Sequence, residues 1–301
     1  MKHFYCIILY LYCLFSFSQQ DPQYTQYMYN MPVINPAYVG ATENLNLGVL
    51  YRNQWTKIDG APQTSTFFGN FKLSENMGAG LSVIADQLGP VRETNIYADI
   101  GYTITLKENH KLAFGLKIGA TFHDIGLNNL IVFDPNDPFF SQDISSTTPN
   151  IGAGLFYFSK NYYAGISVPN FLSSVHLNTN GKRLGSETQH FFITGGYVFE
   201  LSKKAKLKPS FLMKSAFDAP FSFDLNTNML LYDRLEFGIS YRNDDSFSGL
   251  VNFAITAQLN VGYAYDAVTS DIGKFAPSSH EVIIRYSFAE KERRIKSPRF
   301  F

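Results

Sequence analysis

The feature that most constrains this chain is an alternation of apolar and polar residues that runs through most of its length. The alternation is clear from Glu93 to Leu106. It recurs in the segments 191–201, 221–226, 234–241, 251–258 and 281–288. Because successive side chains of a β-strand point to opposite faces, a period of two predicts strands with one apolar and one polar face. About fourteen such segments lie between Leu45 and Phe288, many near the ~10 residues that a tilted membrane-spanning strand needs.

The connections between these segments give a second pattern. One set is short and polar, at residues 74–76, 107–109, 159–161, 202–204, 232–233 and near 260. The connections alternating with them tend to be longer, at residues 56–61, 87–92, 124–147, 170–186 and 269–277, although those near Asp218 and Asp244 are short. Short periplasmic turns opposite longer outer loops are typical of an even-stranded bacterial outer-membrane barrel.

A secreted β-sandwich also alternates, but strands of ten residues exceed the ~5–6 typical of soluble sheets. Aromatic residues make up 16% and charged residues 17% of the chain, where soluble domains average roughly 25% charged. The predicted fold class is therefore all-β, a transmembrane antiparallel β-barrel of about 14 strands with a short N-terminal helical segment. The 25 Lys and Arg balance the 25 Asp and Glu, which argues against a nucleic-acid partner.

Residues 1–18 have the form of a signal peptide. A short basic start precedes an apolar run over residues 4–17, and Ser16 and Ser18 occupy the small-residue positions of a cleavage site. The run is too short for a spanning helix. Cleavage after Ser18 would remove Cys6 and Cys13, the chain's two cysteines, and leave an exported protein without thiols, disulfides or cysteine metal sites.

Residues 19–44 do not alternate. Asp21 followed by Pro22 predicts a helix start, with Asp as N-cap and Pro in the first turn. Four residues then follow with helical spacing: Tyr24, Tyr27, Met28 and Met31. They form one apolar face, which ends at Pro32. We expect a short amphipathic helix that plugs the lumen, lies against the periplasmic mouth or contacts a partner. Partner binding by the first three of these residues and packing inside the barrel remain open alternatives.

Charged residues recur on the polar face of the strands. They are Asp99, Lys214, Asp224, Arg234, Glu236, Arg242, Glu281 and Arg285. In a barrel they would point into the lumen, where charges of mixed sign line a pore or pair with one another. We favour structural ion pairing, since the mixed signs give no argument for ion selectivity.

The connection at 124–147 is the longest predicted outer loop, and its apolar residues make it a candidate partner surface. They are Leu127, Leu130, Ile131, Val132, Phe133, Phe139 and Phe140. Exposed apolar clusters of this kind often mark binding sites. The candidate partner-binding residues here are Leu130, Phe133, Phe139 and Phe140. A constriction folded into the lumen is the alternative for this loop.

Motifs for catalysis or cofactors are not found in the sequence. It has no G-x-S-x-G elbow, P-loop or HExxH motif. The five histidines after residue 18 have no metal-ligand spacing, and the stretch 134–138 lacks the spacing of a calcium loop. We therefore predict no cofactor, no metal and no enzymatic activity.

Two blocks before the first strand carry a family resemblance. Residues 20–30 have the sequence QDPQYTQYMYN, and residues 34–40 have the sequence INPAYVG. With YRNQW at 51–55, APQT at 61–64 and SPRF at 297–300, they resemble the PorP/SprF family. These are outer-membrane proteins of the type IX secretion and gliding machinery of Bacteroidetes.

The resemblance implies an outer-membrane barrel that cooperates with secreted surface proteins. Its implied partners are outer-membrane lipid and adhesins that carry a type IX C-terminal signal domain, and the periplasmic motor ring is a further candidate. We predict a signal peptide (1–18), a helical lead or plug (19–44), the barrel (45–288) and a basic tail (289–301). Binding or anchoring of secreted proteins is the first functional hypothesis, and a passive channel for small solutes is the alternative.

Overall fold

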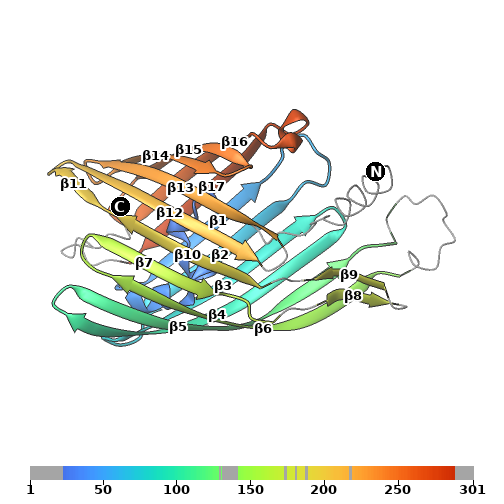
Figure 1. Ribbon diagram of the computed structural model, residues 1–301, viewed down its shortest axis with the longest axis horizontal. Helices are drawn as coiled ribbons and strands as arrows, with labels where there is room; N and C mark the ends of the chain where they lie inside the picture. Colours follow the sequence, from blue (N-terminus) through green and yellow to red (C-terminus); the bar gives the residue numbers. More distant parts are fainter. Residues whose placement is uncertain are drawn as a thin grey trace, which may run out of the picture.

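The computed structural model describes residues 23–128, 130, 142–172, 175–179, 182–186, 189–216 and 219–288. Its main feature is a closed antiparallel β-barrel (Figure 1). The main sheet has 15 segments, of which β10 and β11 are two parts of one strand interrupted at Val198, so the barrel has 14 strands. Pairing of β1 with β17 closes the barrel, with Leu50 opposite Ile283. The predicted fold class is confirmed.

The barrel strands follow one another around the wall in chain order. They are β1 (Asn46–Asn53), β2 (Gln63–Lys72), β3 (Met77–Leu88), β4 (Val91–Lys107), β5 (His110–Ile125), β6 (Ile144–Phe158), β7 (Tyr162–Val168), β10 (His190–Tyr197), β11 (Phe199–Ser202), β12 (Ala205–Ala216), β13 (Ala219–Leu231), β14 (Leu235–Arg242), β15 (Ser246–Ala254), β16 (Leu259–Val268) and β17 (Ser278–Ser287). A separate hairpin joins β8 (Val175–Thr179) to β9 (Lys182–Ser186). The helical elements are η1 (Tyr27–Tyr29), α2 (Met31–Ile34), η2 (Pro36–Ala41) and η4 (Asp271–Lys274).

The wall is apolar outside and largely polar inside. On β5, Leu116 and Ile118 are 58% and 62% exposed, whereas Lys117 between them is fully buried. A water-soluble sheet would show the opposite order. An apolar outer surface around a polar lumen is the arrangement of a barrel surrounded by lipid.

The two ends of the barrel differ in their connections. We call the end with residues 54–62, 126–143, 169–189 and 269–277 the loop end, and the end with residues 73–76, 108–109, 159–161, 203–204, 232–234 and 255–258 the turn end. At the turn end, aromatic rings stack on the outer surface, with centroids 6.0 Å apart for His110 and Tyr157 and 6.3 Å for Tyr162 and Tyr197. Tyrosine rings are enriched at membrane–water interfaces.

Three of the predicted long connections differ in the structure. The connection predicted at 87–92 is wrong, because β3 and β4 pair as far as Leu88 and Val91 and are joined by Gly89 and Pro90 alone. Gly89 has a φ of +54°, which glycine adopts without steric cost. The loop predicted at 124–147 is shortened to 126–143, since β5 and β6 pair up to Ile125 and Ile144. The segment 170–186 contains the β8–β9 hairpin.

The N-terminal segment is also different from the amphipathic helix that the periodicity predicts. It contains two short 3-10 helices and one α-helical turn, and Pro32 and Pro36 lie at the start of α2 and of η2. No helix among the described residues is long and apolar enough to cross a membrane. The signal peptide, the Asp21–Pro22 helix start and the tail at 289–301 fall outside the described residues and stay predictions.

Candidate functional site

The N-terminal segment, residues 23–44, lies inside the barrel (Figure 1, blue), and we call it the plug. Its apolar side chains are buried on all sides: Tyr24, Tyr27 and Met28 are 5%, 2% and 3% exposed. A helix with a single apolar face would leave its other face to water, but the wall surrounds this segment. The plug therefore belongs to the hydrophobic core of the molecule.

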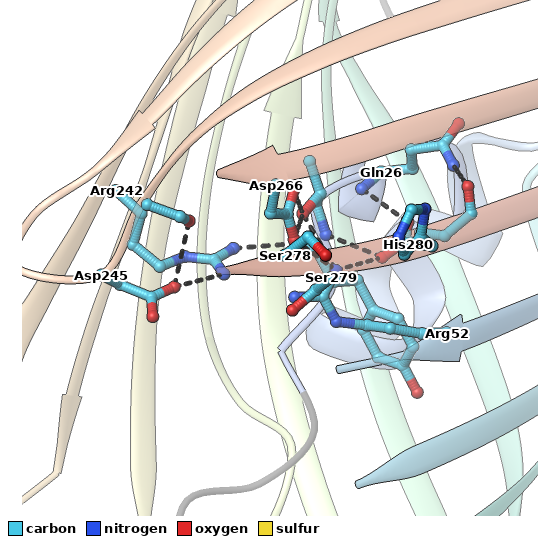
Figure 2. Close-up of polar contacts among 12 residues, drawn as sticks. Gln26, Arg52, Arg242, Asp245, Asp266, Ser278, Ser279 and His280 are labelled. Carbon is cyan, nitrogen blue, oxygen red and sulfur yellow. Dashed lines mark hydrogen bonds and ion pairs between the residues drawn. The ribbon is translucent and has the colours of Figure 1, made fainter. Parts of the chain in front are cut away.

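At the loop end, two acidic side chains of the wall bind the plug, and Figure 2 labels one of them, Asp266. Glu281 of β17 accepts hydrogen bonds from the backbone N–H groups of Thr25 and Gln26, at 3.0 and 2.8 Å. Asp266 of β16 accepts one from the Thr25 hydroxyl at 2.8 Å. Arg52 of β1 pairs with both acids, at 2.8 Å from Asp266 and 3.0 Å from Glu281, and these three charged residues are no more than 2% exposed. A carboxylate thus satisfies two backbone donors of an irregular segment, which would otherwise be buried without partners.

A second arginine extends this site along the wall. The Arg242 guanidinium holds Asp224 with two parallel hydrogen bonds of 2.9 and 2.8 Å and donates a third to the Tyr24 carbonyl at 3.2 Å. It also lies 3.3 Å from Asp245, and in Figure 2 Asp266 lies between Arg242 and Arg52. Planar guanidinium groups suit such two-point contacts. We call Arg52, Asp224, Arg242, Asp266 and Glu281 the anchor cluster.

From this cluster the plug runs along the wall formed by β12 to β17 towards the turn end. Asn226 donates to the Tyr27 hydroxyl at 3.0 Å, and Asn228 to the Tyr29 hydroxyl at 3.4 Å. The Arg285 guanidinium lies 4.1 Å from the centre of the Tyr29 ring, within range of a cation–π contact.

The plug then crosses the lumen to the opposite wall. The Lys117 ammonium lies 2.8 Å from Asp99 and donates to the Pro32 carbonyl at 3.2 Å. The Ser167 hydroxyl donates to the Ile34 carbonyl at 2.6 Å. Carbonyls that no helix satisfies are therefore bound by charged and hydroxyl side chains of β5 and β7.

At the turn end, η2 lies against a track of glycines. Three glycines face η2: Gly78 from β3, Gly101 from β4 and Gly115 from β5. A Cβ atom on any of them would collide with the backbone of η2. The Thr103 hydroxyl donates to the Gly40 carbonyl at 2.7 Å. Close backbone approach is a specific use of glycine in strands. The plug is thus held at the loop end by charge and at the turn end by close packing.

The structure places seven of the eight predicted lumen charges on the lumen side of the wall. They are Asp99, Lys214, Asp224, Glu236, Arg242, Glu281 and Arg285. Arg234 is different: it is exposed in the turn after β13. Tyr232 and Asp233, directly before it, have φ values of +55° and +52°, so the alternation ends at Leu231. The lumen prediction is wrong for Arg234.

The predicted partner-binding residues lie in two places. Tyr24, Tyr27 and Met28 are buried in the plug, where they contact the wall. Leu130 is 36% exposed beyond β5, and Phe133, Phe139 and Phe140 fall outside the described residues. Partner binding by these residues stays a prediction.

Sequence reasoning missed several residues that hold the plug. Arg52, Lys117 and Asp266 carry buried charges on the lumen face. The alternation already places Lys117 on the other face of its strand from Leu116 and Ile118, so the sequence alone could have predicted an inward charge at this position. No comparable signal marks Thr25 or Gln26, because their role depends on backbone groups that the fold brings to Glu281.

Ser279 and His280 lie near Asp266 of the anchor cluster in Figure 2, but they do not form a catalytic triad. Ser279 is 2% exposed and its hydroxyl accepts a hydrogen bond from the Trp55 backbone at 3.1 Å. His280 points away from it, and its Nδ1 lies 2.7 Å from the Tyr263 hydroxyl. Among the described residues, no three His, Cys, Asp or Glu side chains are grouped as metal ligands.

Solved structures share this fold. The chain is similar to a FadL homologue of Pseudomonas aeruginosa, with 10% identity over 89% of this chain and 95% of that one and a TM-score of 0.51. It is also similar to the toluene transporter TbuX of Ralstonia pickettii, with 10% identity over 87% and 92% and a TM-score of 0.54. At these identities the likeness concerns the fold alone.

Sequence comparison is more specific. A search of curated protein sequences finds no match. A family model described as type IX secretion system membrane protein PorP/SprF matches residues 16–286, which include the plug and all the barrel strands but the last residue of β17. The match confirms the resemblance carried by the two blocks before the first strand. The chain belongs to the PorP/SprF family of type IX secretion system membrane proteins.

Proposed function

We propose that this protein is a non-enzymatic outer-membrane component of the type IX secretion and gliding machinery that binds or anchors secreted cell-surface proteins. The observation that carries the proposal is the plug. The protein's own chain occupies the lumen and is held there by hydrogen bonds from Thr25 to Gly40. A barrel whose lumen is filled in this way offers its loops and rim to partners.

The buried charges favour a fixed plug over a loosely held one. Removing one member of a buried ion pair costs ~3–5 kcal/mol, because it leaves the other member uncompensated. The anchor cluster couples Arg52 to two acids and Arg242 to Asp224. Release of the plug breaks the hydrogen bonds that Glu281 and Arg242 make to its backbone, and those that Arg52 and Asp266 make to the Thr25 hydroxyl. A steady open pore is therefore the less favoured function.

The family and the fold also support the proposed partners and location. The outward apolar surface requires lipid, and family membership points to the outer membrane and to partners within the secretion machinery. We propose a secreted adhesin with a type IX signal domain as the main partner and the periplasmic motor ring as a second. The apolar loop residues Leu130, Phe133, Phe139 and Phe140 are the proposed contacts for the adhesin.

A passive channel for small solutes is the second candidate function. It is suggested by the polar lumen face, and one barrel of similar fold is described as a toluene transporter. Conductance in a planar bilayer separates the two functions. We expect the purified barrel to stay closed, and a large steady conductance would support the channel.

Affinity purification from the native envelope tests the first proposal directly. We expect recovery of a secreted protein with a type IX signal domain, and repeated purifications without one would count against anchoring. The loop contribution is tested by deleting residues 127–140. Surface retention of the secreted protein should fall while the barrel still migrates as a folded species in an unheated gel. Unchanged retention in that variant would refute the role of the loop.

A further inference from the structure

We infer that the plug is threaded from the outer mouth of the barrel to the periplasmic mouth, so that its first described residue, Gln23, lies at the outer mouth. A secreted protein can reach this end of the plug, and a periplasmic component cannot. The identity of that partner rests on the proposed function, but the direction of threading rests on geometry alone.

The first plug residues, Tyr24 and Thr25, contact strand ends at the loop end of the barrel. Glu281 is the fourth residue of β17, and Asp266 lies two residues before the end of β16; both bind Thr25. Arg242, the last residue of β14, binds the Tyr24 carbonyl. A small cavity of about 40 Å³ next to Gln23 is lined by residues near the same end, among them Lys214 and Ser222. The chain therefore enters the lumen at the loop end.

The last plug residues contact the opposite end. Gly40 binds Thr103, four residues before β4 ends, and its backbone lies against Gly101. The Thr42 hydroxyl donates to Asn70 of β2 at 3.3 Å, two residues before that strand ends. β1 then begins at Asn46 and runs back towards the loop end. The plug thus connects one mouth of the barrel with the other.

The connections assign the two mouths to the two sides of the membrane. Bacterial barrels have short turns in the periplasm and longer loops outside. The turn end has connections such as 108–109 and 203–204, whereas the loop end has 54–62 and 269–277. Gln23 therefore lies towards the outside and η2 towards the periplasm.

The outer loops are tied to the same strand ends that bind the plug. The Trp55 backbone N–H donates to the Ser279 hydroxyl at 3.1 Å. Ser279 lies two residues before Glu281 of the anchor cluster. The Thr269 backbone donates to the Asp245 carbonyl at 2.8 Å, and the carboxylate of Asp245 pairs with Arg242. The residues that hold Tyr24 and Thr25 are therefore joined directly to these outer loops.

Cysteine labelling tests the direction. Cys6 and Cys13 are the chain's two cysteines and both lie in the predicted signal peptide, so Gln20→Cys introduces a single thiol into the exported chain. Lys274→Cys marks the loop end and Glu75→Cys the turn end; both positions are exposed. Intact cells and lysed envelopes are treated with a membrane-impermeant maleimide, with the unsubstituted protein as the background control.

We expect Gln20→Cys to label in intact cells as fully as Lys274→Cys, while Glu75→Cys labels only after lysis. Labelling of Gln20→Cys only after lysis, together with Glu75→Cys, would overturn the inference. So would a thiol at residue 20 that reacts only after denaturation, because it would be shielded on both sides. The labelling pattern does not depend on any cargo, so failed anchoring with outward labelling would overturn the proposed function and leave the threading intact.

Discussion

Replacement of Arg52 by methionine removes the cation that holds two buried acids together. Arg52 lies 2.8 Å from Asp266 and 3.0 Å from Glu281. It also donates to the Thr25 hydroxyl at 3.1 Å. Methionine keeps much of the length of the arginine side chain but none of its donors. In Arg52→Met, both carboxylates face the plug backbone without their shared counter-ion.

The expected loss follows from the burial of the cluster. Removing one partner of a buried ion pair costs ~3–5 kcal/mol, and all three side chains are at most 2% exposed. At 1.4 kcal/mol per tenfold change, the equilibrium between held and released plug shifts by about two to three and a half powers of ten. The strand pairs of the wall are unaffected, since Arg52 contributes only its backbone to the β1–β2 and β1–β17 ladders.

Single-channel recording measures this shift. The unsubstituted barrel should stay closed, and Arg52→Met should show frequent openings. Lys206→Met is the matched control, because Lys206 pairs with Asp233 at the surface, where the two side chains are 35% and 52% exposed and such pairs contribute ~0–1 kcal/mol. Combining Arg52→Met with Glu281→Gln removes one stranded charge and should restore part of the closure. A closed Arg52→Met barrel with unchanged thermal unfolding would refute the assignment of the anchor cluster.

Two further predictions concern the other contacts of the plug. Gly101→Val should displace η2 and lower the thermal unfolding midpoint, since overpacking costs ~1–3 kcal/mol. Gly249→Ala should leave the midpoint unchanged, because a Cβ there would meet nothing within 4 Å. Equal midpoints for the two variants would contradict the close packing of η2. Glu236→Ala should raise the open probability in bilayers, because the 2% exposed Glu236 accepts a hydrogen bond from Asn228 at 2.6 Å. Arg234→Ala, in the exposed turn, should leave the open probability unchanged. An effect of Arg234→Ala alone would contradict the placement of Glu236 in the lumen and of Arg234 outside it.

The strands could be predicted because their pattern is local and is repeated. Each strand shows its two faces in its own residues, as Leu116, Lys117 and Ile118 do on β5. Strand ends were harder to predict. Gly89 and Pro90 are turn residues within a polar stretch that resembles a loop, and the pairing of Gln87 with Arg92 depends on two strands already being aligned. Turn chemistry gives the position of a turn more reliably than its length.

The plug could be predicted as a segment but not as a structure. Its spacing of Tyr24, Tyr27 and Met28 is helical, yet a helix this short is marginal in water, and the prolines at α2 and η2 interrupt it. Its conformation depends on the wall instead. Glu281, Lys117 and Thr103 are distant in sequence from the plug groups they bind, so no local pattern reveals the pairing.

The polar lumen has a different explanation in a plugged barrel than in an open pore. An irregular segment carries backbone N–H and C=O groups that neither a helix nor a sheet satisfies, and in a lumen shielded from water they need side-chain partners. Glu281 supplies acceptors to two N–H groups, and Lys117 and Arg242 supply donors to two carbonyls. Inward groups of both kinds, acceptors and donors, serve this segment, and charged side chains supply the strongest of them. Mixed charge on the polar face of the strands, which gives no argument for ion selectivity, is therefore what a barrel closed by its own backbone can use.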